Sequence, residues 1–80
     1  MYTDEMRRAF KSLDNFCPKG FQLTIIDNDH FLTLKASEKT FMSLRDEDKR
    51  IAVEYMIRAK NALEDNGAIV LLVREGGEEL

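Results

Sequence analysis

The first apolar residues of the chain recur at helical spacing, at Met6, Ala9, Phe10 and Leu13. This spacing puts them on one side of a helix. Thr3 precedes them as an N-cap, and Asp4 and Glu5 occupy the first turn, where the helix dipole favours acidic side chains. Asn15 and the Pro-Lys-Gly sequence at 18–20 predict that the helix ends there and the chain turns.

Two apolar-rich segments, 21–26 and 31–36, predict a β-hairpin. A two-residue turn at Asn28-Asp29 would pair Asp27 with His30. On one face this register pairs Ile25 with Leu32, Leu23 with Leu34, and Phe21 with Ala36. On the other face it pairs Ile26 with Phe31, Thr24 with Thr33, and Gln22 with Lys35.

The second half of the chain predicts a short helix, a long helix and a last strand. Ser37 caps the short helix, which carries Phe41 and Leu44. The long helix runs from about Asp46 to about Glu64, with a core stripe of Ile51, Ala52, Tyr55, Met56, Ala59, Ala62 and Leu63. Asp65-Asn66-Gly67 stops this helix. The continuous apolar run 68–73 is typical of a strand that is central or covered on both faces.

The order helix-strand-strand-helix-helix-strand predicts an α+β fold in one domain, residues 1–80. A single three-stranded sheet packed by the two principal helices buries these apolar stripes most economically. We expect the polar tail at 76–80 to fray.

The charge balance argues against a protein whose first task is to bind nucleic acid. The net charge is −3, whereas nucleic-acid-binding domains usually present a basic face. A local basic patch around the short helix remains as an alternative, formed by Lys35, Lys39, Arg45, Lys49 and Arg50.

Cysteine use and hydropathy indicate where the protein works. Cys17 is the single cysteine, so no intramolecular disulfide can form, which fits a reducing compartment. No apolar run approaches the roughly 20 residues that span a bilayer. The acidic start of the chain has no apolar signal core. We therefore expect a cytosolic protein.

Candidate chemistry is concentrated in Asp27-Asn28-Asp29-His30. Two carboxylates and an imidazole can hold a divalent metal, which makes His30 a weak metal candidate. A tight turn explains the same residues more simply, because Asn and Asp accept left-handed backbone conformations. Cys17 has no neighbouring base, and the charges of the long helix alternate in sign as on a solvated face. The sequence predicts no catalytic residue, no cofactor and no enzyme.

Two apolar pairs are left over once the core is assigned. Ile26 and Phe31 lie on the hairpin face opposite Leu23 and Leu34, and Val53 and Ile57 sit among the charges of the long helix. The first helix is long enough to cover one pair but not both. Exposed apolar clusters on a small domain are candidate partner surfaces.

The chain resembles the BolA-like family, which has a type II KH-like fold. The resemblance rests on Asp29-His30-Phe31 opening the second strand, Ala36-Ser37 closing it, the following Phe41, and the segment 49–53. It implies the element order given above and a monothiol glutaredoxin as partner. The family's iron–sulfur histidine before the last strand is missing, because 66–69 reads Asn-Gly-Ala-Ile. A KH-type Gly-x-x-Gly loop is missing too, because no glycine lies between Gly20 and Gly67.

These patterns predict a small, non-catalytic regulatory or adaptor protein that acts through protein contacts. Its partner would be another protein, such as a monothiol glutaredoxin, or a second copy of the chain. Two alternatives stay open: a weak nucleic-acid-binding KH-like domain, and an unrelated small protein that binds and blocks a partner.

Overall fold

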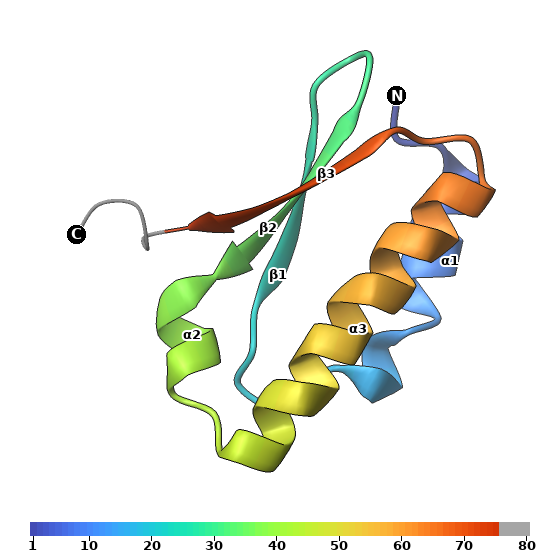
Figure 1. Ribbon diagram of the computed structural model, residues 1–80. Coiled ribbons are helices and arrows are strands. Elements are labelled where there is room, and N and C mark those ends of the chain that lie inside the picture. Colours follow the sequence, from blue (N-terminus) through green and yellow to red (C-terminus); the bar gives the residue numbers. More distant parts are fainter. Residues whose placement is uncertain (76–80) are drawn as a thin grey trace.

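The helices of the protein pack on one face of a three-stranded sheet (Figure 1). The computed structural model describes residues 1–75, so the predicted tail at 76–80 lies outside the described residues. The elements are α1 (Asp4–Lys11), a 3₁₀ turn (Asp14–Phe16), β1 (Leu23–Asp27), β2 (Leu32–Ser37), α2 (Glu38–Met42), α3 (Asp46–Asp65) and β3 (Val70–Glu75). The predicted α+β class and element order are confirmed.

The helix starts follow from local capping. The Thr3 hydroxyl accepts the N–H of Met6 at 3.1 Å, which satisfies one free donor of α1. The Ser37 hydroxyl accepts the N–H of Thr40 at 3.3 Å at the start of α2. After the C-terminal end of α3, Gly67 adopts a φ of +95°. This conformation suits glycine and lets the chain leave the helix.

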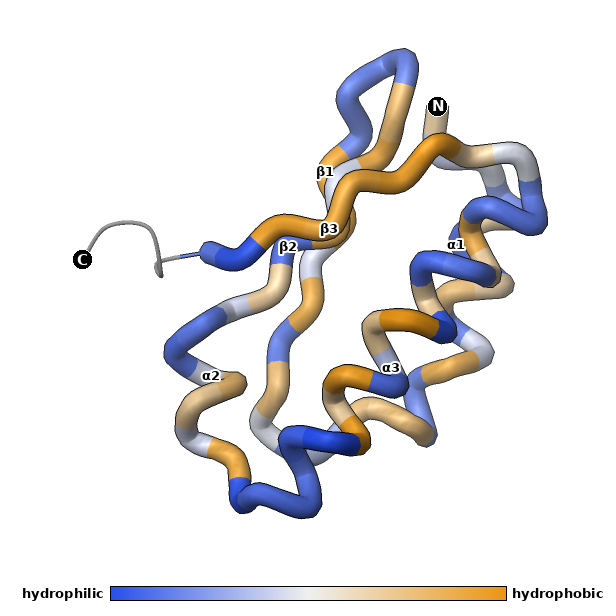
Figure 2. Tube along the Cα trace, viewed as in Figure 1, coloured by the Kyte–Doolittle hydropathy of each residue, from blue (hydrophilic) through white to orange (hydrophobic). Residues whose placement is uncertain are grey.

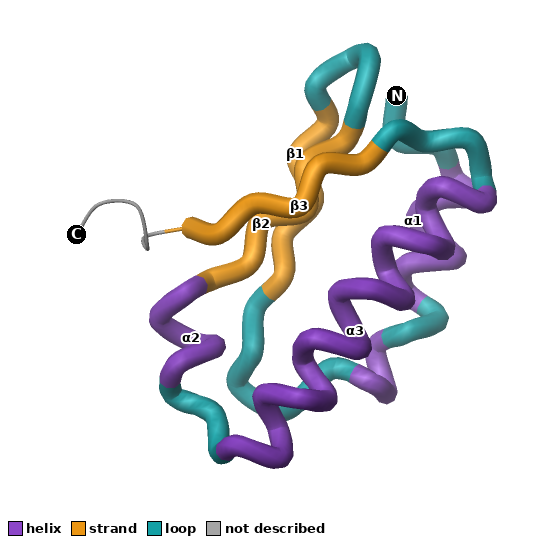
Figure 3. The backbone as a smooth tube through the Cα atoms, in the orientation of Figure 1, coloured by secondary structure: helices purple, strands orange, loops and turns teal. Residues whose placement is uncertain are grey.

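The central strand of the sheet is β2 (Figure 3). It pairs with β1 in an antiparallel and with β3 in a parallel arrangement. The prediction for the last strand is therefore corrected: β3 spans Val70–Glu75, lies at an edge, and is not covered on both faces. The hairpin supplies one neighbour of β2, and the α2–α3 crossover brings β3 to its other side. Among residues 1–75, β3 therefore has β2 as its one neighbouring strand.

The hairpin register differs from the predicted one by two residues. Asp27 lies opposite Leu32, Ile25 opposite Leu34, and Ile26 opposite Thr33. The turn is shifted along the chain: the strands end at Asp27 and Leu32, the N–H of Asn28 donates to the carbonyl of Phe31 at 3.0 Å across Asp29 and His30, and Asp29 adopts a φ of 68°. A slip of two residues keeps every side chain on its predicted face, since side chains alternate with a period of two.

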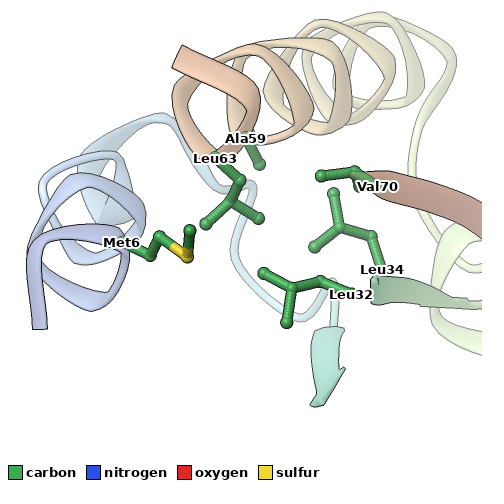
Figure 4. Packing of buried hydrophobic residues seen from close by; sticks show 6 residues of the cluster. All are labelled: Met6, Leu32, Leu34, Ala59, Leu63 and Val70. Atoms are coloured by element: carbon green, nitrogen blue, oxygen red, sulfur yellow. The ribbon is translucent and has the colours of Figure 1, made fainter. Parts of the chain in front are cut away.

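The core lies between the sheet and the helices α1 and α3 (Figure 4). Its first cluster consists of Met6, Leu32, Leu34, Ala59, Leu63 and Val70. A second cluster consists of Phe21, Ala36, Ala52 and Tyr55, and half-buried Phe10, Leu13 and Leu23 pack against both. One residue of the predicted α3 stripe is corrected: Ile51 is 45% exposed, because it lies at the margin of the buried arc.

Candidate partner-binding surface

One face of the sheet carries none of the core-forming helices, because α1, α2 and α3 all pack on the other face. The strand register places side chains there in two rows. Ile26, Thr33 and Leu71 form one row, and Thr24, Lys35 and Val73 form the next. We call these six residues the open sheet face. It contains exposed Ile26, Leu71 and Val73, and Leu71 is 50% exposed.

The predicted Ile26–Phe31 pair is corrected. Phe31 lies in the loop before β2 and is half-buried, and Ile26 faces Thr33 across the strand. α1 does not cover Ile26, because its Met6 packs against Leu32 on the opposite face. The other apolar residues of the open sheet face are Leu71 and Val73, which lie across β2 from Ile26 and had been predicted to belong to a covered strand.

Two of the three polar residues of the open sheet face, Thr33 and Lys35, have side-chain partners within the molecule. The amide of Asn28 donates to the Thr33 hydroxyl at 2.8 Å, and the Lys35 ammonium lies 3.7 Å from the Glu75 carboxylate. A partner on this face would therefore meet apolar side chains beside two polar residues that already have contacts within the molecule.

A second exposed apolar region lies on α3. Val53 and Ile57 project from α3 as the α3 ridge, and Ile57 is 52% exposed. Next to them, a cavity of about 290 Å³ opens between α2, α3 and β3, and Met42, Met56 and Leu72 help to line it. Arg74 and Glu38 face each other at this cavity, 3.7 Å apart. Figure 2 shows the apolar stretch of β3 on the outside of the sheet.

The predicted basic residues do not form one uniform patch. Lys35 lies on the open sheet face, whereas Lys39, Arg45, Lys49 and Arg50 lie along α2 and the start of α3. That end of α3 also carries Asp46, Glu47 and Asp48. The Lys49 ammonium lies 3.9 Å from the Asp46 carboxylate, so acidic groups oppose the basic charge locally.

Asp27 has a structural position in the hairpin. Its carboxylate accepts the N–H of Tyr2 at 2.9 Å and that of Asp29 at 3.2 Å, and it also contacts the amino group of Met1. The hydrogen bond from the amino group is the main cause that holds the pKa of Asp27 below its ordinary value. His30 is exposed in the same loop. Within residues 1–75 no three His, Cys, Asp or Glu side chains converge as a metal site.

Cys17 faces the interior rather than a reactive centre. Its half-buried thiol donates to the carbonyl of Phe21 at 3.5 Å and contacts the carbonyl of Pro18 at 3.6 Å. Burial raises the pKa of the thiol, which favours the protonated form. The polar contacts of Cys17 thus fit a packed residue.

The flank of α3 opposite the ridge carries an aromatic contact that the sequence reading missed. The Arg58 guanidinium lies over the Phe16 ring, 4.6 Å from its centre, beside the exposed Ile51. No local pattern signals this contact, because the 3₁₀ turn that carries Phe16 is placed by the tertiary fold.

No helix in the described part of the chain has the length and apolar character needed to cross a membrane. Comparisons with protein-family models, with curated proteins and with solved structures found no match to this chain.

Proposed function

We propose that this protein is a non-catalytic adaptor that binds a partner protein through its open sheet face. The observation that carries the proposal is the apolar group Ile26, Leu71 and Val73, which is exposed on the sheet face that the helices leave free. Isolated exposed apolar residues are common, but three of them on one sheet face, from both edge strands, favour an interaction surface.

The side chains of Cys17 and Asp27, two candidates for chemistry, have contacts that fit a structural role. The Cys17 thiol has a pKa that burial raises, and it donates to backbone carbonyls, whereas a nucleophilic cysteine needs a lowered pKa and a nearby base. The Asp27 carboxylate, which lies in the same hairpin turn as His30, is occupied by backbone and amino-terminal donors.

A monothiol glutaredoxin is the partner class that the resemblance to BolA-like proteins suggests. The element order of the fold agrees with that resemblance. Because the chain has no histidine at the start of β3, we propose contact with the glutaredoxin without donation of a cluster ligand from that position.

The test compares Ile26→Ser with Ile51→Ser, which removes the same side chain from an exposed site on α3. Binding to a purified monothiol glutaredoxin is measured by calorimetry, and binding to proteins captured from a lysate is measured in parallel. Burial of one aliphatic side chain is worth about 1.5–3 kcal/mol, so Ile26→Ser should raise the dissociation constant for the partner by roughly 10- to 100-fold. Ile51→Ser should bind normally.

Equal binding by both variants would contradict use of the open sheet face. Failure of the glutaredoxin to bind, together with Ile26-dependent binding of a captured protein, would reject the glutaredoxin and retain the adaptor function. Circular dichroism of each variant ensures that the comparison is made between folded proteins.

A further inference from the structure

The outer edge of β3, the side that faces away from β2, carries backbone groups that are not part of the open sheet face. The N–H of Leu32 donates to the carbonyl of Ile69 at 2.8 Å, and the parallel pairing continues from Leu32–Val70 to Ser37–Glu75. In a parallel ladder, alternate residues of a strand direct their backbone groups to one neighbour. Leu71 and Val73 therefore turn toward β2, whereas Val70, Leu72 and Arg74 turn their N–H and C=O groups outward.

No strand among residues 1–75 occupies this outer side. Exposed edges are usually short, charged, bulged or covered, because they can pair with another chain. Here the apolar segment 69–73 forms most of the edge. The first charged residues, Arg74 and Glu75, come directly after this segment. The edge thus has the composition of a paired strand.

We propose that a second copy of this chain pairs with β3, antiparallel and about a two-fold axis at Leu71. This register places Leu71 opposite Leu71 of the second copy, Val70 opposite Leu72, and Ile69 opposite Val73. Every residue of the apolar segment then meets an apolar residue, and Arg74 and Glu75 fall outside these pairs. Directly opposed residues of antiparallel strands share a face, so the helices of both copies lie on the same side of a six-stranded sheet.

The α3 ridge supplies the area that a strand edge alone lacks. Specific interfaces bury roughly 800 Å² on each partner, which requires more than one strand edge. α3 packs on β3 through Ala59, Leu63 and Val70, so α3 is the helix that borders the axis. Pairing the strands brings the two α3 helices together and covers Val53, Ile57 and the 44% exposed Leu72.

The charges beside the ridge fit an antiparallel copy. Arg50, Ile57 and Glu64 follow at seven-residue intervals on one side of α3. When two such helices cross antiparallel at Ile57, Arg50 of each copy meets Glu64 of the other. Glu64 already pairs with Lys60 at 2.8 Å, which keeps its carboxylate on this flank. A foreign extended peptide would pair with the edge but would leave the ridge uncovered, so a second copy explains more of the surface.

Sedimentation equilibrium of the full chain tests the dimer, with Ile57→Ser and Ile51→Ser as a matched pair on the two flanks of α3. We expect a dimer whose dissociation constant rises at least tenfold in Ile57→Ser and is unchanged in Ile51→Ser. Ile26→Ser, on the far strand β1, should dimerise normally, so failure of this proposal is distinguishable from failure of the proposed function. A monomer up to about 1 mM, or equal effects of the two α3 variants, would overturn the proposal.

A cysteine cross-link tests the register. Opposed residues that do not exchange hydrogen bonds have Cα atoms about 4.5 Å apart, within the range of a disulfide. In a Cys17→Ser background, Leu71→Cys should form a covalent dimer on mild oxidation, whereas Leu72→Cys should not. Cross-linking of Leu72→Cys in place of Leu71→Cys would show that the pairing at Leu71 is wrong.

Discussion

At the scale of single residues, one carboxylate ties the start of the chain to the hairpin. Asp27 accepts the N–H groups of Tyr2 and Asp29 and contacts the Met1 amino group. Each donor stabilises the ionised form, which explains the direction of its pKa shift. Asp27 thus fixes both the last residue of β1 and the approach to α1.

We expect stability to depend on the ionisation of Asp27. Its pKa is lower in the folded chain than the ordinary value of about 3.9, so its contribution is complete above that pH. The contribution is lost as the pH falls from about 3.9 through the lower folded pKa. Urea unfolding at pH 7 and pH 2 measures this loss, and carboxyl chemical shifts report the titration. Asp27→Asn should lower stability more at pH 7 than at pH 2; equal differences at both pH values would contradict the prediction.

At the scale of elements, the hairpin shows where sequence reading succeeds and where it stops. The two faces of the strands were predicted correctly, because apolar alternation records them directly. The register was wrong by two residues, because it depends on how Asp27, Asn28 and Asp29 bond within the loop. Thr3 and Ser37 were identified correctly as caps, since capping involves only neighbouring residues.

The positive φ of Asp29 restricts which residues this position accepts. Asp29→Val should destabilise the fold by about 1–2 kcal/mol, because a branched side chain clashes in the left-handed region. Asp29→Asn and Asp29→Gly tolerate that region and should change stability by less than about 1 kcal/mol. Chemical denaturation of the three variants gives the comparison. A valine variant as stable as the asparagine variant would show that the loop has another conformation.

At the scale of the whole molecule, burial of the last strand could not be predicted. A continuous apolar run has the same sequence pattern whether its own chain or another molecule covers it. The segment 68–73 was predicted to be covered by its own chain. The exposed apolar residues were therefore predicted only in part: Ile26, Val53 and Ile57 were predicted to be exposed, whereas the exposure of Leu71, Leu72 and Val73 emerged from the topology. The resemblance to BolA-like proteins stays a prediction.

The distribution of charge predicts the outcome for nucleic acid. The net charge is −3, and acidic residues share the end of α3 with Lys49 and Arg50. We expect no DNA or RNA binding at physiological salt in fluorescence anisotropy, because affinity for phosphates needs a concentrated basic surface. Micromolar binding that falls steeply with salt, and that Lys39→Ala with Arg50→Ala abolishes, would contradict this. Lys60→Ala, on the C-terminal half of α3, is the control for a change in total charge.

The parallel pairing of β2 with β3 also determines the order in which the chain can fold. The hairpin joins near neighbours in sequence, whereas β3 reaches β2 only after the chain has passed through α2 and α3. Contacts between distant segments form slowly, because a long loop must close first. During that delay the segment 69–73, apolar and free of proline and charge, is available to other unfinished chains. Newly made protein therefore has its greatest tendency to aggregate in the interval between formation of the hairpin and docking of β3.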